Sequence, residues 1–214
     1  MDIQKTIKSL IKNNMQAYVL EDKSEVVPYL QKLIKTGSKV GAGGSVTLVQ
    51  CGVIDFLRNG NYVFFDREKP NITNEELEEI FEKEKHTDFY LCSANAITEN
   101  GELYNVDGRS NRISCIVHGP KNVIIVAGKN KLVKNLEQAV HRVKTIAAPK
   151  NCKRLNFKNY CASAGICVSL NKKKPAMTDG CDSLQRSCCN YLISTMQRVR
   201  GRVIVLIINE DLGY

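Results

Sequence analysis

Three short apolar runs constrain the fold of this chain more than any other feature. They span Asp88–Ser93, Asn122–Ala127 and Val203–Ile208, and read DFYLCS, NVIIVA and VIVLII. Each run is typical of a strand that is buried on both faces of a sheet. Segments with helical periodicity separate them. Buried strands that alternate with helices predict an α/β fold, with a mostly parallel sheet and helices on both of its faces.

The segments around these strands complete the predicted organisation. Residues 1–36 are expected to form an N-terminal helical segment, because apolar residues such as Ile3, Ile7 and Leu10 recur at helical spacing. Asn100-Gly101 lies between two strand-like runs, which predicts a β-hairpin with a type I′ turn. Further strands are expected at Lys39–Val40 and Asn61–Phe65, and further helices at Val46–Leu57, from Asn74 onwards and at Lys131–Ile146.

Length and composition narrow the class of protein. A chain of 214 residues with 43% hydrophobic and 25% charged residues has globular composition, which excludes disorder for most of it. No apolar run approaches the roughly 20 residues that cross a bilayer. The first residues, MDIQKTIKSLIKNN, lack the apolar core of a secretory signal. These features predict a cytoplasmic protein without a membrane span.

The formal net charge of +9 is concentrated in one segment. Residues 1–149 contain 20 basic and 18 acidic residues, whereas residues 150–202 contain 11 basic residues against Asp179 and Asp182 alone. The same segment holds six of the nine cysteines, so we expect a basic, Cys-rich insertion before the last strand. Such a block is a candidate nucleic-acid surface, but it has few aromatic residues and no binding signature, which disfavours nucleic acid as a partner.

A glycine-rich stretch after the first predicted strand of the sheet is the sharpest local motif. Residues 40–47 read VGAGGSVT, so a strand leads through glycine-rich backbone into the start of a helix. Backbone N–H groups at such a position bind phosphate or carboxylate. The alternative is a tight turn that only joins the strand to the helix. The predicted ligand-binding residues here are Gly41, Gly43, Gly44, Ser45 and Thr47.

The predicted hairpin and its flanks form a second candidate site. Open α/β sheets place ligands beside the carboxyl ends of buried strands, and this polar segment follows one of them. A positioned carboxylate such as Glu99 can act as a nucleophile or a base. Arg112 can clamp a carboxylate with its planar guanidinium. Additional candidate ligand-binding residues are Asn95, Asn105, Asp107 and Asn111; the alternative is that all of them are ordinary turn residues.

The cysteines of the insertion allow two interpretations. None of them forms the C-x2-C pair that zinc fingers and ferredoxins use. Thiolates that converge in three dimensions would still hold a metal, and neighbouring basic residues favour the thiolate form. The alternative is a set of reduced thiols, as is usual in an intracellular protein.

Several stretches in order along the chain resemble the LUD (lactate utilisation) domain family. They are GAGGSVTL, AITENGELYNVDG with the following NRIS, GPKNVIIVAGKNKLV, VKTIAAPKN and NEDLGY. The resemblance covers residues 37–214, which we expect to form one LUD-like α/β domain, and two N-terminal helices are typical of short members. It implies a fold like that of the group containing ribose-5-phosphate isomerase, glucosamine-6-phosphate deaminase and CoA transferases, in which a glycine-rich loop faces the ligand.

The resemblance also implies chemistry. CoA transferases of this group use a Glu nucleophile in a Glu-Asn-Gly turn, and Glu99-Asn100-Gly101 is similar to it. Some LUD proteins belong to an iron–sulfur-containing system that oxidises L-lactate, with the redox groups mainly on partner subunits. Short members carry a cysteine segment before the last strand. By that resemblance the candidate ligands of a zinc ion or an iron–sulfur cluster are Cys161, Cys167, Cys181 and Cys189.

These observations predict a cytoplasmic LUD-domain protein that binds a small anionic metabolite at the glycine-rich loop and takes part in lactate or organic-acid utilisation. One hypothesis makes it a subunit that works with iron–sulfur or other redox partner subunits. A second makes it an isomerase or CoA-transferase-like enzyme that uses Glu99. A third makes it a non-catalytic module whose Cys-rich block binds a partner. Whether it forms a homo-oligomer is left open.

Overall fold

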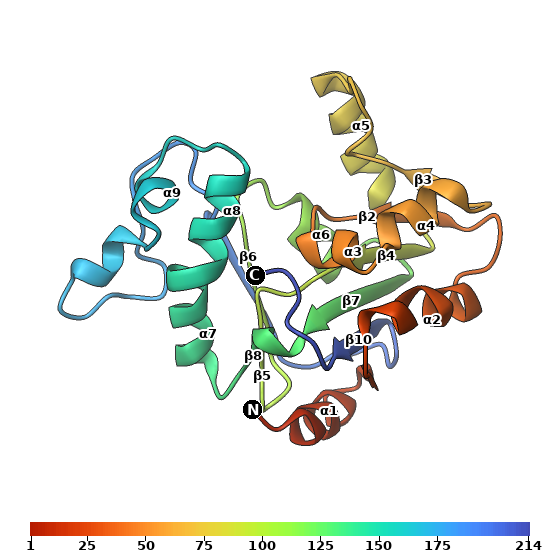
Figure 1. Ribbon diagram of the computed structural model, residues 1–214, viewed down its shortest axis with the longest axis horizontal. Helices are drawn as coiled ribbons and strands as arrows, with labels where there is room; N and C mark the ends of the chain where they lie inside the picture. Colours follow the sequence, from red (N-terminus) through yellow and green to blue (C-terminus); the bar gives the residue numbers. More distant parts are fainter.

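The computed structural model describes residues 1–214 and contains two sheets. The larger sheet has six strands, all parallel, in the order β1-β10-β7-β4-β2-β3 (Figure 1). The predicted α/β class with a mostly parallel sheet is confirmed. The three apolar runs become its central strands, which are buried on both faces. The strands are β1 (Gln16–Leu20), β2 (Lys39–Ala42), β3 (Val63–Phe65), β4 (Phe89–Cys92), β7 (Asn122–Gly128) and β10 (Val203–Ile208).

Helices cover both faces of the large sheet, as predicted. One apolar core joins the sheet to α1 (Ile3–Lys12) and α6 (Asn111–Val117). The core on the other face joins it to α2 (Val26–Leu33), α3 (Val46–Gln50) and α4 (Val53–Asn59). Helix α5 (Asn74–Glu84) contacts β2 and β3 at the sheet edge and begins with a capping box formed by Thr73 and Glu76.

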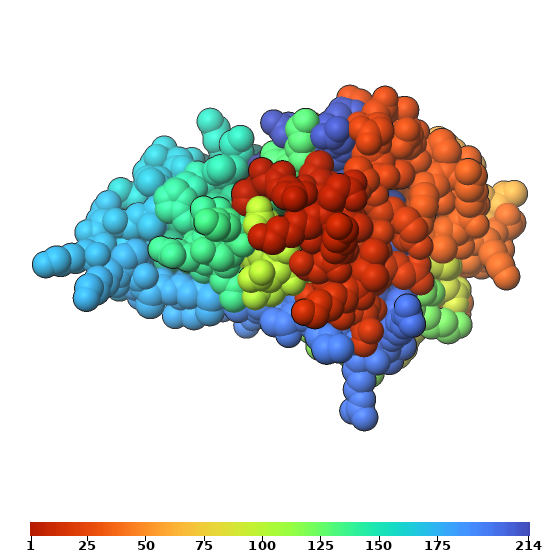
Figure 2. Space-filling view, turned by 90° about the horizontal axis from the view of Figure 1, so that it is seen from below, coloured from red at the N-terminus to blue at the C-terminus, as the bar shows by residue number.

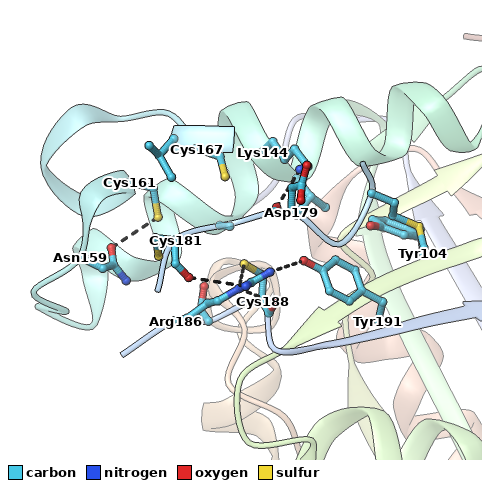
Figure 3. A pocket seen from close by; sticks show the side chains of 15 residues that line it. Tyr104, Lys144, Asn159, Cys161, Cys167, Asp179, Cys181, Arg186, Cys188 and Tyr191 are labelled. Carbon is cyan, nitrogen blue, oxygen red and sulfur yellow. Dashed lines mark hydrogen bonds between the residues drawn. The ribbon is translucent and has the colours of Figure 1, made fainter. Parts of the chain in front are cut away.

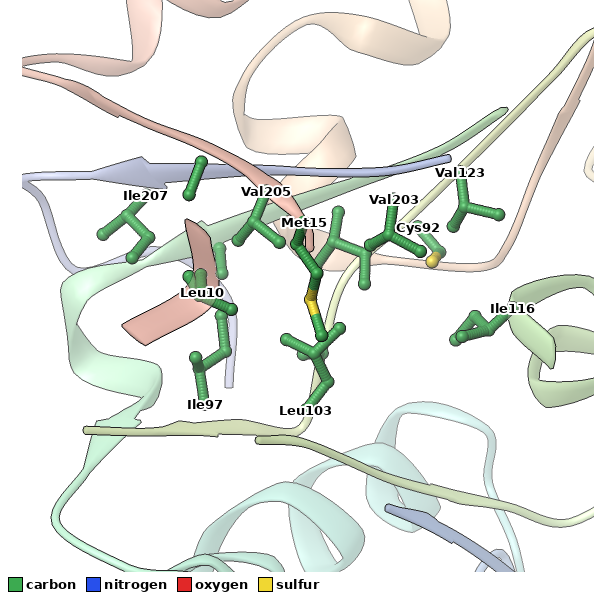
Figure 4. Packing of buried hydrophobic residues seen from close by; sticks show 14 of the residues in the cluster. Leu10, Met15, Cys92, Ile97, Leu103, Ile116, Val123, Val203, Val205 and Ile207 are labelled. Carbon is green, nitrogen blue, oxygen red and sulfur yellow. The ribbon is translucent and has the colours of Figure 1, made fainter. Parts of the chain in front are cut away.

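A second, four-stranded sheet packs over the α1 and α6 face. Its strand order is β8-β5-β6-β9, with β5 and β6 forming the predicted antiparallel hairpin. Leu10 and Met15 lie between this sheet and the large one (Figure 4). The outer face of the small sheet packs on helices α7 (Leu136–Arg142) and α8 (Ala148–Arg154), which one π-helical turn joins. The strands are β5 (Ala96–Thr98), β6 (Leu103–Asp107), β8 (Leu132–Val133) and β9 (Asn190–Ser194), and a short helix α9 (Tyr160–Ala164) precedes β9.

Strand pairing changes three sequence-based expectations, and a left-handed glycine changes a fourth. Residues 16–20, within the expected helical segment, form edge strand β1, which pairs with β10. Residues 190–194 of the expected insertion form β9, which pairs with β6. The helix expected from Lys131 begins at Leu136, because residues 132–133 pair with β5 as β8. The helix expected over residues 46–57 is broken at Gly52, whose φ of 68° is left-handed.

The hairpin turn also differs from the type I′ expectation. A type I′ turn needs positive φ at both central residues, but of the Asn100-Gly101 pair only Gly101 has one, at 79°. The Gly101 N–H donates to the Thr98 carbonyl at 2.9 Å. The tip packs on α1, where a Cβ at Gly101 would lie 2.8 Å from the Leu10 nitrogen. The hairpin tip that packs on α1 therefore does not have the predicted type I′ turn.

The order of the strands creates a topological switch point between β2 and β4. From β2 the chain moves outward to β3, then returns to form β4 on the other side of β2. The connections that follow β2 and β4 therefore diverge and leave a crevice at their carboxyl ends. Open α/β sheets bind ligands at such a crevice. Here it is bordered by residues 43–45 after β2 and residues 93–95 after β4.

Glu84, the last residue of α5, places a carboxyl group beside the carboxyl end of β2. Its side chain is fully buried, and Oε1 accepts from the Ala42 N–H at 3.3 Å while Oε2 has no partner. It packs against Gly41, where a Cβ would lie 2.8 Å from Glu84 Cγ. Burial raises the pKa of Glu84 from 4.5 to about 7, because the charged form is poorly solvated there.

We expect this carboxyl group to make stability depend on pH. The folded protein keeps a proton that the unfolded chain releases above pH 4.5, so the contribution of Glu84 to stability falls as pH rises towards 7. Glu84→Gln should remove that fall in urea titrations between pH 4.5 and 8. Glu82→Gln, at an exposed position on the same helix, should keep it. Equal slopes for the two variants would contradict this interpretation.

Candidate functional site

A cavity of about 490 Å³ occupies the switch point, and we call it the switch-point cavity. The ends of β2 and β4 form one wall, and the end of β6 with the start of α6 forms another. Helix α8 and Tyr214 close a third side; residue 214, marked C in Figure 1, lies between α8 and α3. Its polar lining includes Gly44, Ser45, Thr47, Arg67, Glu68, Ser93, Asn95, Asp107, Arg109, Asn111, Arg112, Lys131, Asn151, Arg154, Ser187 and Tyr214.

Lys131 is the most unusual group in the cavity. Its side chain is only 3% exposed, and Nζ donates to Thr47 Oγ1 at 2.7 Å and to Ser93 Oγ at 2.8 Å. No carboxylate pairs with it, and its charged neighbours are the cations Arg142 and Arg112. Burial, reinforced by these two arginines, lowers the pKa of Lys131 from 10.5 to about 7. A buried ammonium without a counter-ion strongly favours an anion beside it.

Positive charge dominates the rest of the lining. Five cationic side chains border the cavity against two acidic ones. Arg67 stacks on the Phe81 ring, 4.8 Å from its centroid, and its guanidinium donates no hydrogen bond to the protein. Arg154 donates from Nε to Tyr214 and from one terminal nitrogen to Asn151, which leaves the other terminal nitrogen free. The cavity can therefore attract a ligand with one or more negative charges.

Arg112 connects the walls of the cavity through its hydrogen bonds, and both of its terminal nitrogens already have protein partners. One terminal nitrogen donates to the Ser93 carbonyl at 3.0 Å and to Asn105 Oδ1 at 2.6 Å. The other donates to Asn95 Oδ1 at 3.0 Å and to the Val106 carbonyl at 2.7 Å. Its Nε lies 3.5 Å from a carboxylate oxygen of Asp107. The predicted carboxylate clamp is thus already occupied by protein acceptors.

The glycine-rich loop is split between two roles. Gly44, Ser45 and Thr47, three of the predicted ligand-binding residues, line the cavity. Gly41 and Gly43 do not line it. A Cβ at Gly43 would lie 3.0 Å from the Tyr90 hydroxyl and 3.2 Å from Arg112 Cδ, so this glycine lets Arg112 pass close to the backbone.

The four predicted Asn and Asp residues lie around Arg112. Asn95, Asp107 and Asn111 line the cavity, whereas Asn105 is fully buried behind it. Asn95 and Asp107 form hydrogen bonds within the protein. Asn95 Oδ1 accepts from the Val106 N–H, and Asp107 Oδ1 accepts from the N–H groups of residues 109 and 110. Asn111 Nδ2 is buried and has no hydrogen-bond partner in the protein.

Glu99 does not lie at the cavity. It sits on the β5–β6 hairpin and pairs with Lys5 of α1 at 2.7 Å. The Lys5 hydrogen bond lowers the pKa of Glu99, which keeps this carboxylate charged and engaged. Its predicted catalytic role stays a prediction, and the structure separates it from the other candidate site residues.

Cysteines of the 150–202 segment gather in a closed pocket beside the small sheet (Figure 3). The side chains of Cys161, Cys167 and Cys181 line it together with Cys188. Arg186 crosses the pocket and donates to Cys188 Sγ at 3.2 Å. Spacing along the chain does not reveal this convergence, because the four residues come from α9, the turn after it and the irregular segment before β9.

Cys189, the fourth metal ligand implied by the family resemblance, lies apart from this pocket. It is exposed and its thiol bonds to the Arg186 carbonyl, while its neighbour Cys188 points inward. No group of three or more His, Cys, Asp or Glu side chains is placed to hold a metal ion. All nine cysteines are free thiols. The zinc or iron–sulfur expectation therefore stays a prediction.

The basic charge of residues 150–202 is spread over separate parts of the surface. In Figure 2 the segment near residues 170–175 forms the tip at the left, and the segment near 195–200 projects at the bottom. Lys172–Lys174 are exposed in the first segment, and Arg198 and Arg200 in the second. These two groups of basic residues therefore lie apart from each other on the surface.

Four residues that line the cavity were not predicted from the sequence: Lys131, Ser93, Arg154 and Tyr214. Lys131 lies within GKNKLV and Tyr214 within NEDLGY, stretches that carried the family resemblance without an assigned role. Lys131 follows the end of β7, next to β4 in the sheet, so its place after a buried strand was the available signal. Arg154 comes from a helix far along the chain, and only the packing of α8 brings it to the cavity.

The fold and its site define an open α/β protein with a cationic cavity at the switch point of its parallel sheet. The LUD domain family model matches residues 3–208. The chain therefore belongs to the LUD domain family, which supports a role related to lactate utilisation in general terms. None of its helices has the length and apolar character needed to cross a membrane.

Two solved structures are similar to the chain. A DUF162 family protein from Deinococcus radiodurans is 12% identical, with 96% of this chain and 94% of that chain covered and a TM-score of 0.50, which supports the fold. Ribose 5-phosphate isomerase A from Methanocaldococcus jannaschii is 15% identical over 60% of this chain and 65% of its own, with a TM-score of 0.34. No curated protein matches the chain.

We expect Arg112 to act mainly by holding the walls of the cavity. Arg112→Lys should lower the free energy of unfolding by about 3 kcal/mol, because several buried acceptors lose their donor at once. Arg109→Lys should change it by less than about 1 kcal/mol, since Arg109 is exposed and pairs with Glu78 at the surface. Urea denaturation measures both values. Similar small losses in the two variants would show that Arg112 does not hold the walls.

Proposed function

We propose that this protein binds a small organic acid, of the hydroxy-acid or oxo-acid class, in the switch-point cavity. We further propose that it does so as a component of lactate or related organic-acid utilisation. Membership of the LUD domain family supports the metabolic context. The chemistry of the cavity supports the ligand class.

One observation carries the proposal: the Lys131 ammonium is buried without a counter-ion. Burying an unpaired charge costs several kcal/mol, and two neighbouring arginines increase that cost. A carboxylate in the cavity would offset it. Two of the three ammonium N–H groups are used by Thr47 and Ser93, which leaves the third for a ligand.

The surrounding donors suit a carboxylate with a second polar group. Arg67 and one nitrogen of Arg154 are free of protein acceptors, and Asn111 Nδ2 has no partner. Arginine binds carboxylates through two parallel hydrogen bonds. The hydroxyl group of Ser93 accepts from Lys131 and donates to no protein group, so it is available to a hydroxyl or carbonyl oxygen of the ligand.

Calorimetric titration with L-lactate, pyruvate and inorganic phosphate tests the proposal. The wild-type protein should bind at least one of these anions, and Lys131→Met should weaken binding by about tenfold or more, which is about 1.4 kcal/mol. Methionine removes a buried unpaired charge, so the variant should unfold at an equal or higher temperature than the wild type.

Two control variants separate this proposal from the alternatives. Lys129→Met changes an exposed lysine two residues away and should leave affinity unchanged. Glu99→Gln should also leave it unchanged, because Glu99 pairs with Lys5 away from the cavity. Absence of anion binding to the wild type would refute the proposal, and loss of binding in Glu99→Gln would favour the hypothesis that uses Glu99.

Affinity for L-lactate should depend on pH through Lys131. With a pKa of about 7, its amine is cationic below neutral pH and loses its proton above it, so affinity should fall by about tenfold as pH rises from 7 to 9. The lactate carboxylate does not titrate in this range. Lys131→Met should abolish most of this dependence. A profile that is equally steep in the variant would assign the effect to another group.

A further inference from the structure

We propose that Lys131 is also a nucleophile, whose amine forms an imine with the carbonyl carbon of a 2-oxo acid in the switch-point cavity. This inference rests on the proposed function, because the acid must first bind. It adds a covalent activity at the same site.

The hydrogen bonds around Lys131 orient its amine. The Thr47 hydroxyl hydrogen is directed to the Leu212 carbonyl at 3.3 Å, so the Thr47 oxygen acts as an acceptor for Nζ. Ser93 Oγ accepts the second N–H. When the neutral amine donates its two hydrogens to these two hydroxyl oxygens, the lone pair of Nζ is left without a protein partner. Because Lys131 lines the cavity, that lone pair is available to a carbonyl carbon there.

The environment of Lys131 favours the neutral form of its amine near pH 7. Burial and the nearby cations Arg112 and Arg142 disfavour the ammonium, so the pKa of Lys131 falls to about 7. Desolvation and an adjacent cation are the two ways in which proteins activate lysine for imine formation. Near neutral pH both forms are present, so the ammonium attracts the acid and the amine reacts with it.

Ser93 completes the chemistry required for the step. The Lys131 lone pair attacks the carbonyl carbon to form a C–N bond, and one proton passes from nitrogen to the carbonyl oxygen to give a carbinolamine. The C–O bond then breaks, the oxygen leaves as water with the second nitrogen proton, and a C=N bond forms; no electrons are exchanged with another reactant. The Ser93 hydroxyl, which is 8% exposed and lines the cavity, has no protein acceptor and can donate to that oxygen.

The cationic lining selects the class of carbonyl compound. Arg67 and the free nitrogen of Arg154 would bind a carboxylate in the same cavity. A compound with a carboxylate and an adjacent carbonyl group satisfies both the arginines and the amine. Acetaldehyde, which lacks the carboxylate, and L-lactate, which lacks the carbonyl group, are the matched negative probes.

Reductive trapping tests the proposal. Wild-type protein is incubated with pyruvate or 2-oxoglutarate and sodium cyanoborohydride, and adducts are located by peptide mass spectrometry. We expect one dominant adduct at Lys131, formed at least about tenfold faster than at surface lysines. Acetaldehyde should show no such preference, and L-lactate should slow trapping by pyruvate. Adducts spread evenly over surface lysines would overturn the proposal.

Variants separate this inference from the proposed function. Lys131→Met should lose the dominant adduct and Lys129→Met should keep it. Ser93→Ala keeps the lysine and should slow adduct formation by about tenfold or more when it is measured at saturating pyruvate. Wild-type protein that binds pyruvate in titration but gives no Lys131 adduct would overturn the imine and leave the proposed function standing. Failure to bind any oxo or hydroxy acid would overturn both.

Discussion

The hydrogen bonds of Arg112 hold together the elements from which the cavity is built. This side chain begins in α6 and reaches the carbonyl that follows β4, the amides of Asn95 and Asn105 and the backbone at the end of β6. It thereby joins the large sheet to the small one at the switch point. Gly43 is glycine because Arg112 passes beside its backbone. These hydrogen bonds connect the walls of the cavity to one another through a single side chain.

Within this frame the protein holds a buried cation that has no counter-ion. Lys131 has hydroxyl partners but no carboxylate, and the nearest charges are arginines. A residue of this kind lowers the stability of the protein, and the anion that we propose would offset that cost. Lys144, another buried lysine, shows the contrast: it donates to Ser169 and to two carbonyl groups and serves the cysteine-rich segment structurally.

Part of the site was predictable and part was not. Gly44, Ser45 and Thr47 were predicted from the glycine-rich motif and Asn95 from its place after a buried strand, and all four line the cavity. The sequence did not show that the guanidinium of Arg112 donates to protein acceptors, nor that Glu99 pairs with Lys5 of α1. Both depend on partners that only the fold brings close. Cys188 and Cys189 are adjacent and chemically identical; the backbone leading into β9 decides which one faces the pocket.

The sequence by itself determined the α/β class, the central strands, the hairpin and the family, because strands buried on both faces require apolar runs and because ordered motifs identify a LUD domain. The tertiary structure decided that residues 16–20 and 190–194 are strands, since pairing with β10 and β6 outweighs weak local preference. It also decided which charges meet. The free-energy cost of a buried ammonium depends on the charged groups around it in space. The order of residues along the chain does not show that Lys131 lies beside arginines and without a carboxylate.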